Sequence, residues 1–81
     1  MDLLTKSDKV KLAILLELRR GMKMSPSMLA SKIDCKYETV KKSLAFFLTI
    51  KMVKQEISTH GKKRYVHYEL TELGKRVVKS A

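Results

Sequence analysis

The stretch Glu56–Leu73, EISTHGKKRYVHYELTEL, carries the strongest structural signal in the chain. Residues 53–58 and 64–70 are rich in Val, Ile and Tyr and bracket Thr59–Lys63 (THGKK), a pattern that predicts two strands joined by a turn. Gly61 is the natural residue for a positive φ in that turn. Alternation along the second strand puts Val66, Tyr68 and Leu70 on one face and Tyr65, His67 and Glu69 on the other.

The turn of this hairpin is basic, because His60, Lys62, Lys63 and Arg64 surround the glycine. Two interpretations of the tip are open. It is either a solvated turn or a finger that touches a polyanion.

Length and composition set limits on the rest of the molecule. With 81 residues and 44% hydrophobic residues, we expect a single domain, residues 1–81, with one modest core. One cysteine excludes an intramolecular disulfide. No apolar run approaches the roughly 20 residues that span a bilayer, and the first ten residues lack a signal-peptide core. We therefore expect a soluble, cytoplasmic protein.

The net charge of +10 indicates a polyanionic partner. We favour nucleic acid over a charge that serves solubility alone. An anionic membrane surface is disfavoured, because no segment has a wholly basic face opposite a wholly apolar one.

Helical periodicity and capping signals predict four helices. The first covers residues 5–21, with Thr5 or Ser7 as its cap, and buries Val10, Ile14, Leu15 and Leu18. Met22–Met24 is a candidate short extended segment. The second helix follows Ser25 as N-cap and Pro26 at its first position, with a buried face of Met28, Leu29 and Ile33. A tight turn over residues 34–36 separates it from the third, residues 37–52, and Thr71 caps a short last helix that has Leu73 and Val77 at i, i+4.

The third helix has two distinct faces. Its apolar stripe consists of Val40, Leu44, Phe47 and Leu48. The opposite face carries Glu38, Lys41, Lys42, Ala45 and Thr49. Phe46 lies at the flank between them. Two short helices joined by a three-residue turn and followed by a hairpin are an α+β, winged helix-turn-helix layout: a three-helix core with a β-hairpin wing and a short C-terminal helix.

Residues 25–78 resemble winged helix-turn-helix transcription regulators of the multiple-antibiotic-resistance and arsenical-resistance repressor types. The resemblance rests on Leu29-Ala30 and Ile33, on Thr39-Val40 with Leu44 and Phe47, on Met52-Val53, and on YELTELG (residues 68–74) after the basic hairpin. One departure is Lys51, where the family usually has a glycine that ends the recognition helix.

The resemblance implies that the third helix enters the major groove and that the wing reaches the neighbouring backbone or minor groove. The implied DNA-binding residues are Ser25, Lys36, Tyr37, Glu38, Thr39, Lys41, Lys42, His60, Lys62, Lys63 and Arg64. The two helix lysines can meet phosphates or guanine acceptors, and Thr39 can touch a thymine methyl group or a phosphate. Glu38 either accepts from a cytosine amino group or pairs with Lys42 at i, i+4, and we favour the pairing. Tyr37 is as well suited to partial burial as to a DNA contact.

Other chemistry is not indicated. His60 and His67 lack companions at metal-ligand spacing, so we expect no metal site. The sequence contains no nucleophile–base set and no glycine-rich phosphate loop. We therefore expect no cofactor, no small-molecule ligand and no enzyme activity. Cys35 is interpreted as a packing residue rather than a redox sensor. Four apolar residues exceed the needs of the core: Leu3, Leu4, Leu12 and Phe46. They either cap the core or form a homodimer seam between the N-terminal segment, the first helix and the last helix, and we favour a homodimer.

The predicted function is therefore a sequence-specific, double-stranded DNA-binding regulator, a repressor that occupies an operator on the nucleoid. Two alternatives remain open: an architectural or replication/segregation protein that binds DNA without sequence preference, and a winged-helix module that binds other proteins.

Overall fold

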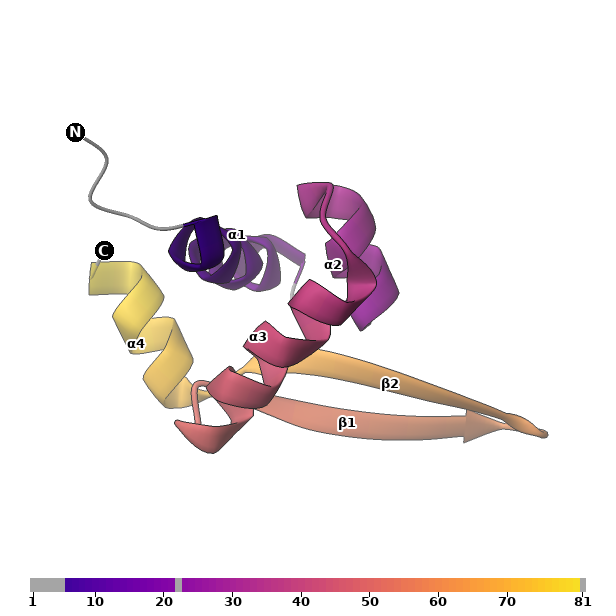
Figure 1. Ribbon diagram of the computed structural model, residues 1–81. Coiled ribbons are helices and arrows are strands. Elements are labelled where there is room, and N and C mark those ends of the chain that lie inside the picture. Colours follow the sequence, from indigo (N-terminus) through magenta and orange to yellow (C-terminus); the bar gives the residue numbers. More distant parts are fainter. Residues whose placement is uncertain (1–5, 22, 81) are drawn as a thin grey trace.

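The elements follow the order expected from the sequence. In the computed structural model, which describes residues 6–21 and 23–80, the elements are α1 (Lys6–Gly21), α2 (Pro26–Ile33), α3 (Tyr37–Thr49), β1 (Val53–His60), β2 (Lys63–Leu70) and α4 (Glu72–Ser80). The antiparallel hairpin projects away from the helices, and α4 lies on the opposite side of the helical core from α2 (Figure 1). This is the α+β winged helix-turn-helix layout, which confirms the predicted fold class. The predictions for Leu3, Leu4, Thr5 and Met22 fall outside the described residues.

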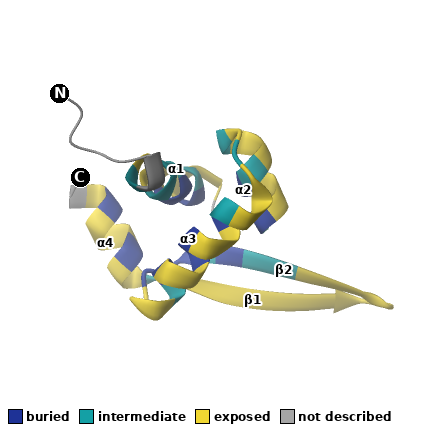
Figure 2. Ribbon diagram, viewed as in Figure 1, coloured by how far each residue is buried: buried dark blue, intermediate teal, exposed yellow. Residues whose placement is uncertain are grey.

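The core is assembled from the apolar stripes of the three helices and the root of the hairpin. The fully buried side chains are Ile14, Leu18, Leu29, Val40 and Leu44. Around them lie Leu15, Met24, Phe47, Met52, Val53, Tyr68, Leu70 and Val78. Burying each large apolar side chain stabilises the fold by about 1.5–3 kcal/mol. Burial stops partway along the hairpin, so its outer half is exposed on both strands (Figure 2).

The second helix begins as predicted but presents a different face to the core. Ser25 has extended backbone angles, and its hydroxyl accepts a hydrogen bond from the Met28 amide at 3.2 Å. Pro26 and Leu29, three residues apart, are its buried residues, whereas Met28 is 47% exposed. The prediction that Met28 is buried is therefore wrong: one residue before Leu29 is a turn of about 100°, enough to place Met28 at the solvent.

The third helix ends at Thr49, three residues before its predicted end, in a Schellman motif. The Met52 amide donates to the Phe47 carbonyl at 2.9 Å, and the Lys51 amide donates to the Leu48 carbonyl at 3.1 Å. Lys51 has φ 62, the left-handed conformation that glycine usually supplies at this position. Phe47 and Met52 are both buried, which provides the apolar contact that accompanies this motif.

A junction of four residues ties the end of α3 to the start of α4. The Thr71 hydroxyl donates to the Lys51 carbonyl at 2.7 Å and accepts from the Gly74 amide at 3.1 Å, so Thr71 caps α4 as predicted. The Thr71 amide donates to the Met52 carbonyl at 3.0 Å. A Cβ on Gly74 would overlap that same carbonyl oxygen, so the close approach requires glycine. We call Lys51, Met52, Thr71 and Gly74 the wing-root junction.

The remaining differences from the predictions concern the strands and α4. Each strand is longer than predicted, because Thr59, His60 and Lys63 belong to the strands and leave a two-residue turn. The predicted segment at residues 22–24 is extended at Met24, which forms a single bridge to Tyr68. In α4, Gly74 and Val78 face the core, so Leu73 and Val77 on the adjacent flank remain exposed.

The wing-root junction predicts a large effect of Gly74→Ala. In an ordinary helix this change stabilises by up to about 1 kcal/mol, whereas here the overlap with Met52 should lower the free energy of unfolding by about 1–3 kcal/mol or more. Urea denaturation measures the change, with Lys79→Ala on the exposed side of α4 as control. Equal or greater stability of the alanine variant would show that the two backbones are not in contact.

The left-handed conformation of Lys51 predicts the opposite effect for Lys51→Gly. Removing the Cβ relieves an unfavourable conformation, so the free energy of unfolding should rise by about 0.5–1 kcal/mol despite the added freedom of the unfolded chain. The matched control is Lys42→Gly in the middle of α3, which should lower it by a similar amount. If Lys51→Gly and Lys42→Gly both lowered the free energy of unfolding, the left-handed conformation of Lys51 at the end of α3 would be contradicted.

Candidate nucleic-acid interface

The turn between α2 and α3 determines how the first turn of α3 is presented. Asp34 caps α2 in the left-handed conformation with φ 52, and the amides of Asp34 and Cys35 both donate to the Ala30 carbonyl. Lys36 is the N-cap of α3, with extended backbone angles and no capping hydrogen bond from its side chain. The α3 N-terminus therefore begins at an exposed lysine, and its free amides add to the positive character of this end.

The outward face of α3 matches the prediction. Glu38, Lys41, Lys42, Ala45 and Thr49 are all exposed, while Val40, Leu44 and Phe47 are buried opposite them. Thr39 is half-buried at the edge of this face. Ser43 is also buried, a position that the apolar pattern did not identify because a small polar residue gives no hydrophobic signal.

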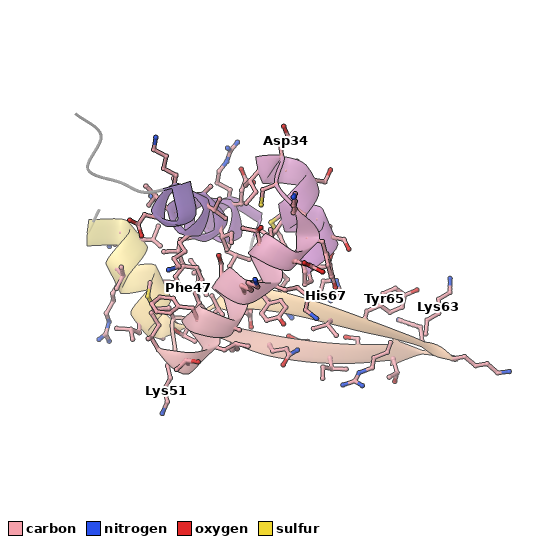
Figure 3. The ribbon with its side chains drawn as sticks, in the orientation of Figure 1. Asp34, Phe47, Lys51, Lys63, Tyr65 and His67 are labelled. Atoms are coloured by element: carbon pink, nitrogen blue, oxygen red, sulfur yellow. The ribbon has the colours of Figure 1, made fainter. Side chains whose placement is uncertain are left out.

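The tip of the hairpin is a two-residue turn. His60 pairs with Lys63 across the strands, leaving Gly61 and Lys62 as the loop. Gly61 has φ 62, as predicted, and glycine at the first of two loop positions is typical of a type II′ turn. The tip residues Lys62, Lys63 and Arg64 are exposed. Figure 3 shows Lys63 and Tyr65 along the outer part of the hairpin and His67 nearer to α3.

A hollow of about 480 Å³ lies between the α2–α3 pair and the wing. Its lining joins predicted site residues from separate parts of the fold: Ser25, Tyr37, Lys41 and Arg64. The other lining residues are Pro26, Ser27, Met28, Gln55, Tyr65, Val66, His67 and Tyr68. The structure therefore brings α3 and the wing to one side of the molecule. Lys36, Glu38, Thr39, Lys42, His60, Lys62 and Lys63 are not part of the lining.

Sequence reasoning missed Met28, Tyr65 and His67 as members of this hollow. Alternation placed Tyr65 and His67 on one face of β2, which is correct, but gave no means of knowing that α2 lies nearby. Tyr65 also contacts His60 edge-to-face, with ring centroids 6.3 Å apart.

Charge is distributed unequally over the wing and α3. At the wing root, Lys23 pairs with Glu56 at 2.8 Å and Lys54 with Glu69 at 3.1 Å. Hydrogen bonding and charge from Lys23 lower the pKa of Glu56 below its ordinary value. By contrast, within residues 6–21 and 23–80 no ion pair is formed by the cations of the α2–α3 turn, the outward face of α3 and the wing tip: Lys36, Lys41, Lys42, Lys62, Lys63 and Arg64. Those six charges remain available to an external anion.

The first turn of α3 carries the two residues for which the sequence left alternatives open, Glu38 and Tyr37. Glu38 makes no ion pair with Lys42 or with any other described residue, so the favoured i, i+4 pairing is wrong. Tyr37 is exposed, and the Lys41 ammonium lies 5.7 Å from the centre of its ring, within cation–π range. The stacked pair borders the hollow.

No group of three His, Cys, Asp or Glu side chains able to hold a metal ion occurs among the described residues. Within the same ranges, no helix is long and apolar enough to cross a membrane. Cys35 is a free, half-buried thiol packed against the core, in keeping with its interpretation as a packing residue.

Several solved structures share this fold. A double mutant of Lactococcus lactis ZitR in apo form matches with a TM-score of 0.80 at 23% identity, over 91% of this chain and 55% of that chain. A MarR family transcriptional regulator from Silicibacter pomeroyi matches at 0.80 and 20% identity, over 93% and 49%. A mutant of E. coli MarR complexed with operator DNA matches at 0.79 and 16% identity, over 95% and 52%.

These likenesses establish the winged-helix fold. The chain spans about half the length of the solved structures it matches. Neither a protein-family model nor a curated protein sequence matches it.

Tyr68, which lines the hollow, is expected to make the stability of the fold depend on pH. Burial raises the pKa of the Tyr68 phenol above its ordinary value of about 10, and the Tyr37 phenol adds to the shift. The folded state therefore retains this proton more strongly than the unfolded state, so its contribution is complete below about pH 10 and is lost as the pH rises through the folded-state pKa.

Urea denaturation from pH 8 to pH 11 should show a steeper loss of stability above about pH 10 for the wild type than for Tyr68→Phe. Tyr65→Phe, at an exposed tyrosine, should follow the wild type. Parallel curves for the wild type and Tyr68→Phe would contradict the raised pKa.

Proposed function

We propose that this chain is a sequence-specific, double-stranded DNA-binding transcription regulator that acts in the cytoplasm as a repressor by occupying an operator. The observation that carries the proposal is the shared hollow. Lys41 of α3 and Arg64 of the wing line one side of the molecule, while the cations at this side and at the wing tip make no ion pairs within the described part of the chain. Such a surface is positioned to follow a duplex backbone.

We assign α3 and the wing to adjacent grooves of the duplex. A helix enters the major groove, about 12 Å wide, with the residues of its first turns at base edges. The first turns of α3 supply Glu38, Thr39, Lys41 and Lys42 for this role. The wing would place Lys62, Lys63 and Arg64 at the neighbouring backbone or minor groove, where the narrow groove's potential favours arginine. Ser25 and Lys36 would contact phosphates, as would Tyr37 through its phenol.

A solved structure of the same fold supports a DNA-binding role. E. coli MarR, whose mutant was solved in complex with operator DNA, has this fold at 16% identity. We extend the DNA-binding role to the present chain because its outward helix face is basic and unpaired, not because of the fold alone.

We also propose a homodimer, since two half-sites about 34 Å apart raise affinity for an operator. The described residues support a seam on α1 and α4. Leu12 and Leu16 of α1 and Leu73 and Val77 of α4 are exposed. Phe46 is less suited to that seam than predicted, because its half-exposed ring already has the Lys11 ammonium 4.4 Å from its centre.

In-vitro site selection followed by binding at several salt concentrations tests the proposal. An enriched palindrome supports a regulator, whereas even coverage of any duplex would indicate an architectural protein. Absence of DNA binding at about 50–100 mM salt, where phosphate contacts are still strong, would indicate a protein-binding module.

Substitutions on α3 predict how its two lysines act. Lys41→Ala or Lys42→Ala should weaken binding to the selected site by about 1–3 kcal/mol if the lysine reads a base. If it contacts only phosphate, the loss should be uniform across sequences and the salt slope should fall by about one. Lys79→Ala on α4 is the matched control. Unchanged affinity after replacing Lys62, Lys63 and Arg64 together would contradict the role of the wing.

A further inference from the structure

Glu38 is the only acidic residue in the sequence of α3, and the other charged residues on its face are Lys41 and Lys42. It occupies the second position of the helix, where the side chains of a recognition helix meet base edges. Under the proposed DNA-binding function, on which this inference rests, the carboxylate of Glu38 would face a base.

Glu38 lies on the outermost part of the α3 surface. At about 100° per residue, Glu38 lies roughly opposite the middle of the buried stripe formed by Val40, Ser43, Leu44 and Phe47. It shares its outward ridge with Lys42, Ala45 and Thr49, all exposed. When this ridge faces a groove, the Glu38 carboxylate faces the floor of the groove rather than its phosphate walls.

No interaction within the described part of the protein explains why α3 carries a carboxylate at position 38. Among residues 6–21 and 23–80 no cation lies within ion-pair distance of Glu38, although Lys42 is only one turn away. The positive end of the helix dipole favours an acidic residue in the first turn. Aspartate, whose side chain is shorter, would satisfy that preference equally well. The helix dipole therefore does not explain why this position carries the longer glutamate side chain, which can reach a base.

The chemistry of the major groove restricts what this carboxylate can bind. An ionised carboxylate only accepts hydrogen bonds. Phosphate oxygens, guanine N7 and O6 and thymine O4 are acceptors too and repel it, which leaves the amino groups of cytosine and adenine. The adenine amino group lies beside the N7 acceptor, whereas cytosine itself presents only its N4 amino donor to the groove.

We propose that Glu38 accepts a hydrogen bond from the N4 amino group of a cytosine in the major groove and thereby determines sequence specificity. The same charge opposes contact with phosphates, so it weakens binding to DNA that does not offer this donor. Glu38 thus raises the ratio of specific to non-specific affinity in two ways: it strengthens binding to the specific site and weakens binding to other DNA.

Site selection with the wild type, Glu38→Gln and Glu38→Ala tests this role. The wild type should enrich one cytosine per half-site, and replacing that C·G pair should weaken binding at least about fivefold. Glutamine both donates and accepts, which matches adenine N6 and N7, so Glu38→Gln should shift the preference from cytosine to adenine. Glu38→Ala should lose the preference and bind random duplex more tightly than the wild type.

Two controls separate base reading from charge and from helix stability. Glu72→Gln removes the same charge from the first turn of α4, which adjoins the C-terminal end of α3 and not the end that carries Glu38, and should leave the selected base unchanged. Glu38→Asp keeps the charge at the α3 N-terminus but shortens its reach, so it should retain stability to urea and lose most of the cytosine preference.

An unchanged selected motif in Glu38→Gln and Glu38→Ala, with the wild type enriching a clear site, would overturn this inference and leave the proposed regulator intact. If the wild type enriches no motif but binds random duplex, both the inference and the regulator proposal fail. A shift confined to the position of the cytosine supports the inference.

Discussion

The hydrogen bond from the Thr71 hydroxyl to the Lys51 carbonyl, 2.7 Å long, holds together the two chain segments on which the rest of the structure depends. Lys51 lies just after the end of α3 and Thr71 just after the end of β2, so this contact fixes both roots of the hairpin against α3. Gly74 strengthens the same junction, because the absence of a Cβ lets α4 approach the Met52 carbonyl. Since the hairpin projects from this point, the junction sets the direction of the wing relative to α3.

That fixed direction has an electrostatic consequence. The hollow between α3 and the wing is bordered by Lys41 and Arg64, which make no ion pair with any described residue, whereas the root of the wing neutralises its own charges through Lys23–Glu56 and Lys54–Glu69. A surface with free cations binds phosphates without first breaking internal ion pairs. Under the proposed function, Glu38 places a negative charge on the outward face of α3 beside this surface. Attraction between the free cations and phosphates does not depend on the DNA sequence, whereas the Glu38 contact would.

Much of the fold could be predicted because local pattern and tertiary packing agree. The alternation of Val66, Tyr68 and Leu70, and the capping by Ser25 and Thr71, describe the elements correctly. Prediction was wrong where tertiary contact decides the outcome. Met28 belongs to an eight-residue helix, in which a change of one position moves a side chain from core to solvent.

The same reason explains the differences in α4 and at the candidate site. In α4 the close approach to Met52 places Gly74 rather than Leu73 against the core. The hollow could not be predicted, because it joins α2 to the wing across about forty residues of sequence. Glu38 and Lys42 form no ion pair although their spacing allows one. The small free energy of an exposed pair means that spacing alone does not decide whether it forms.

Amide chemical-shift mapping during titration with a short duplex is the most direct test of a single DNA-binding face. If the junction presents α3 and the wing to one duplex, the largest perturbations will fall together in residues 36–49 and 60–66, at the same protein-to-DNA ratio, with little change in α4. Perturbations centred on α1 and α4, or in the wing without α3, would contradict a single DNA-binding face.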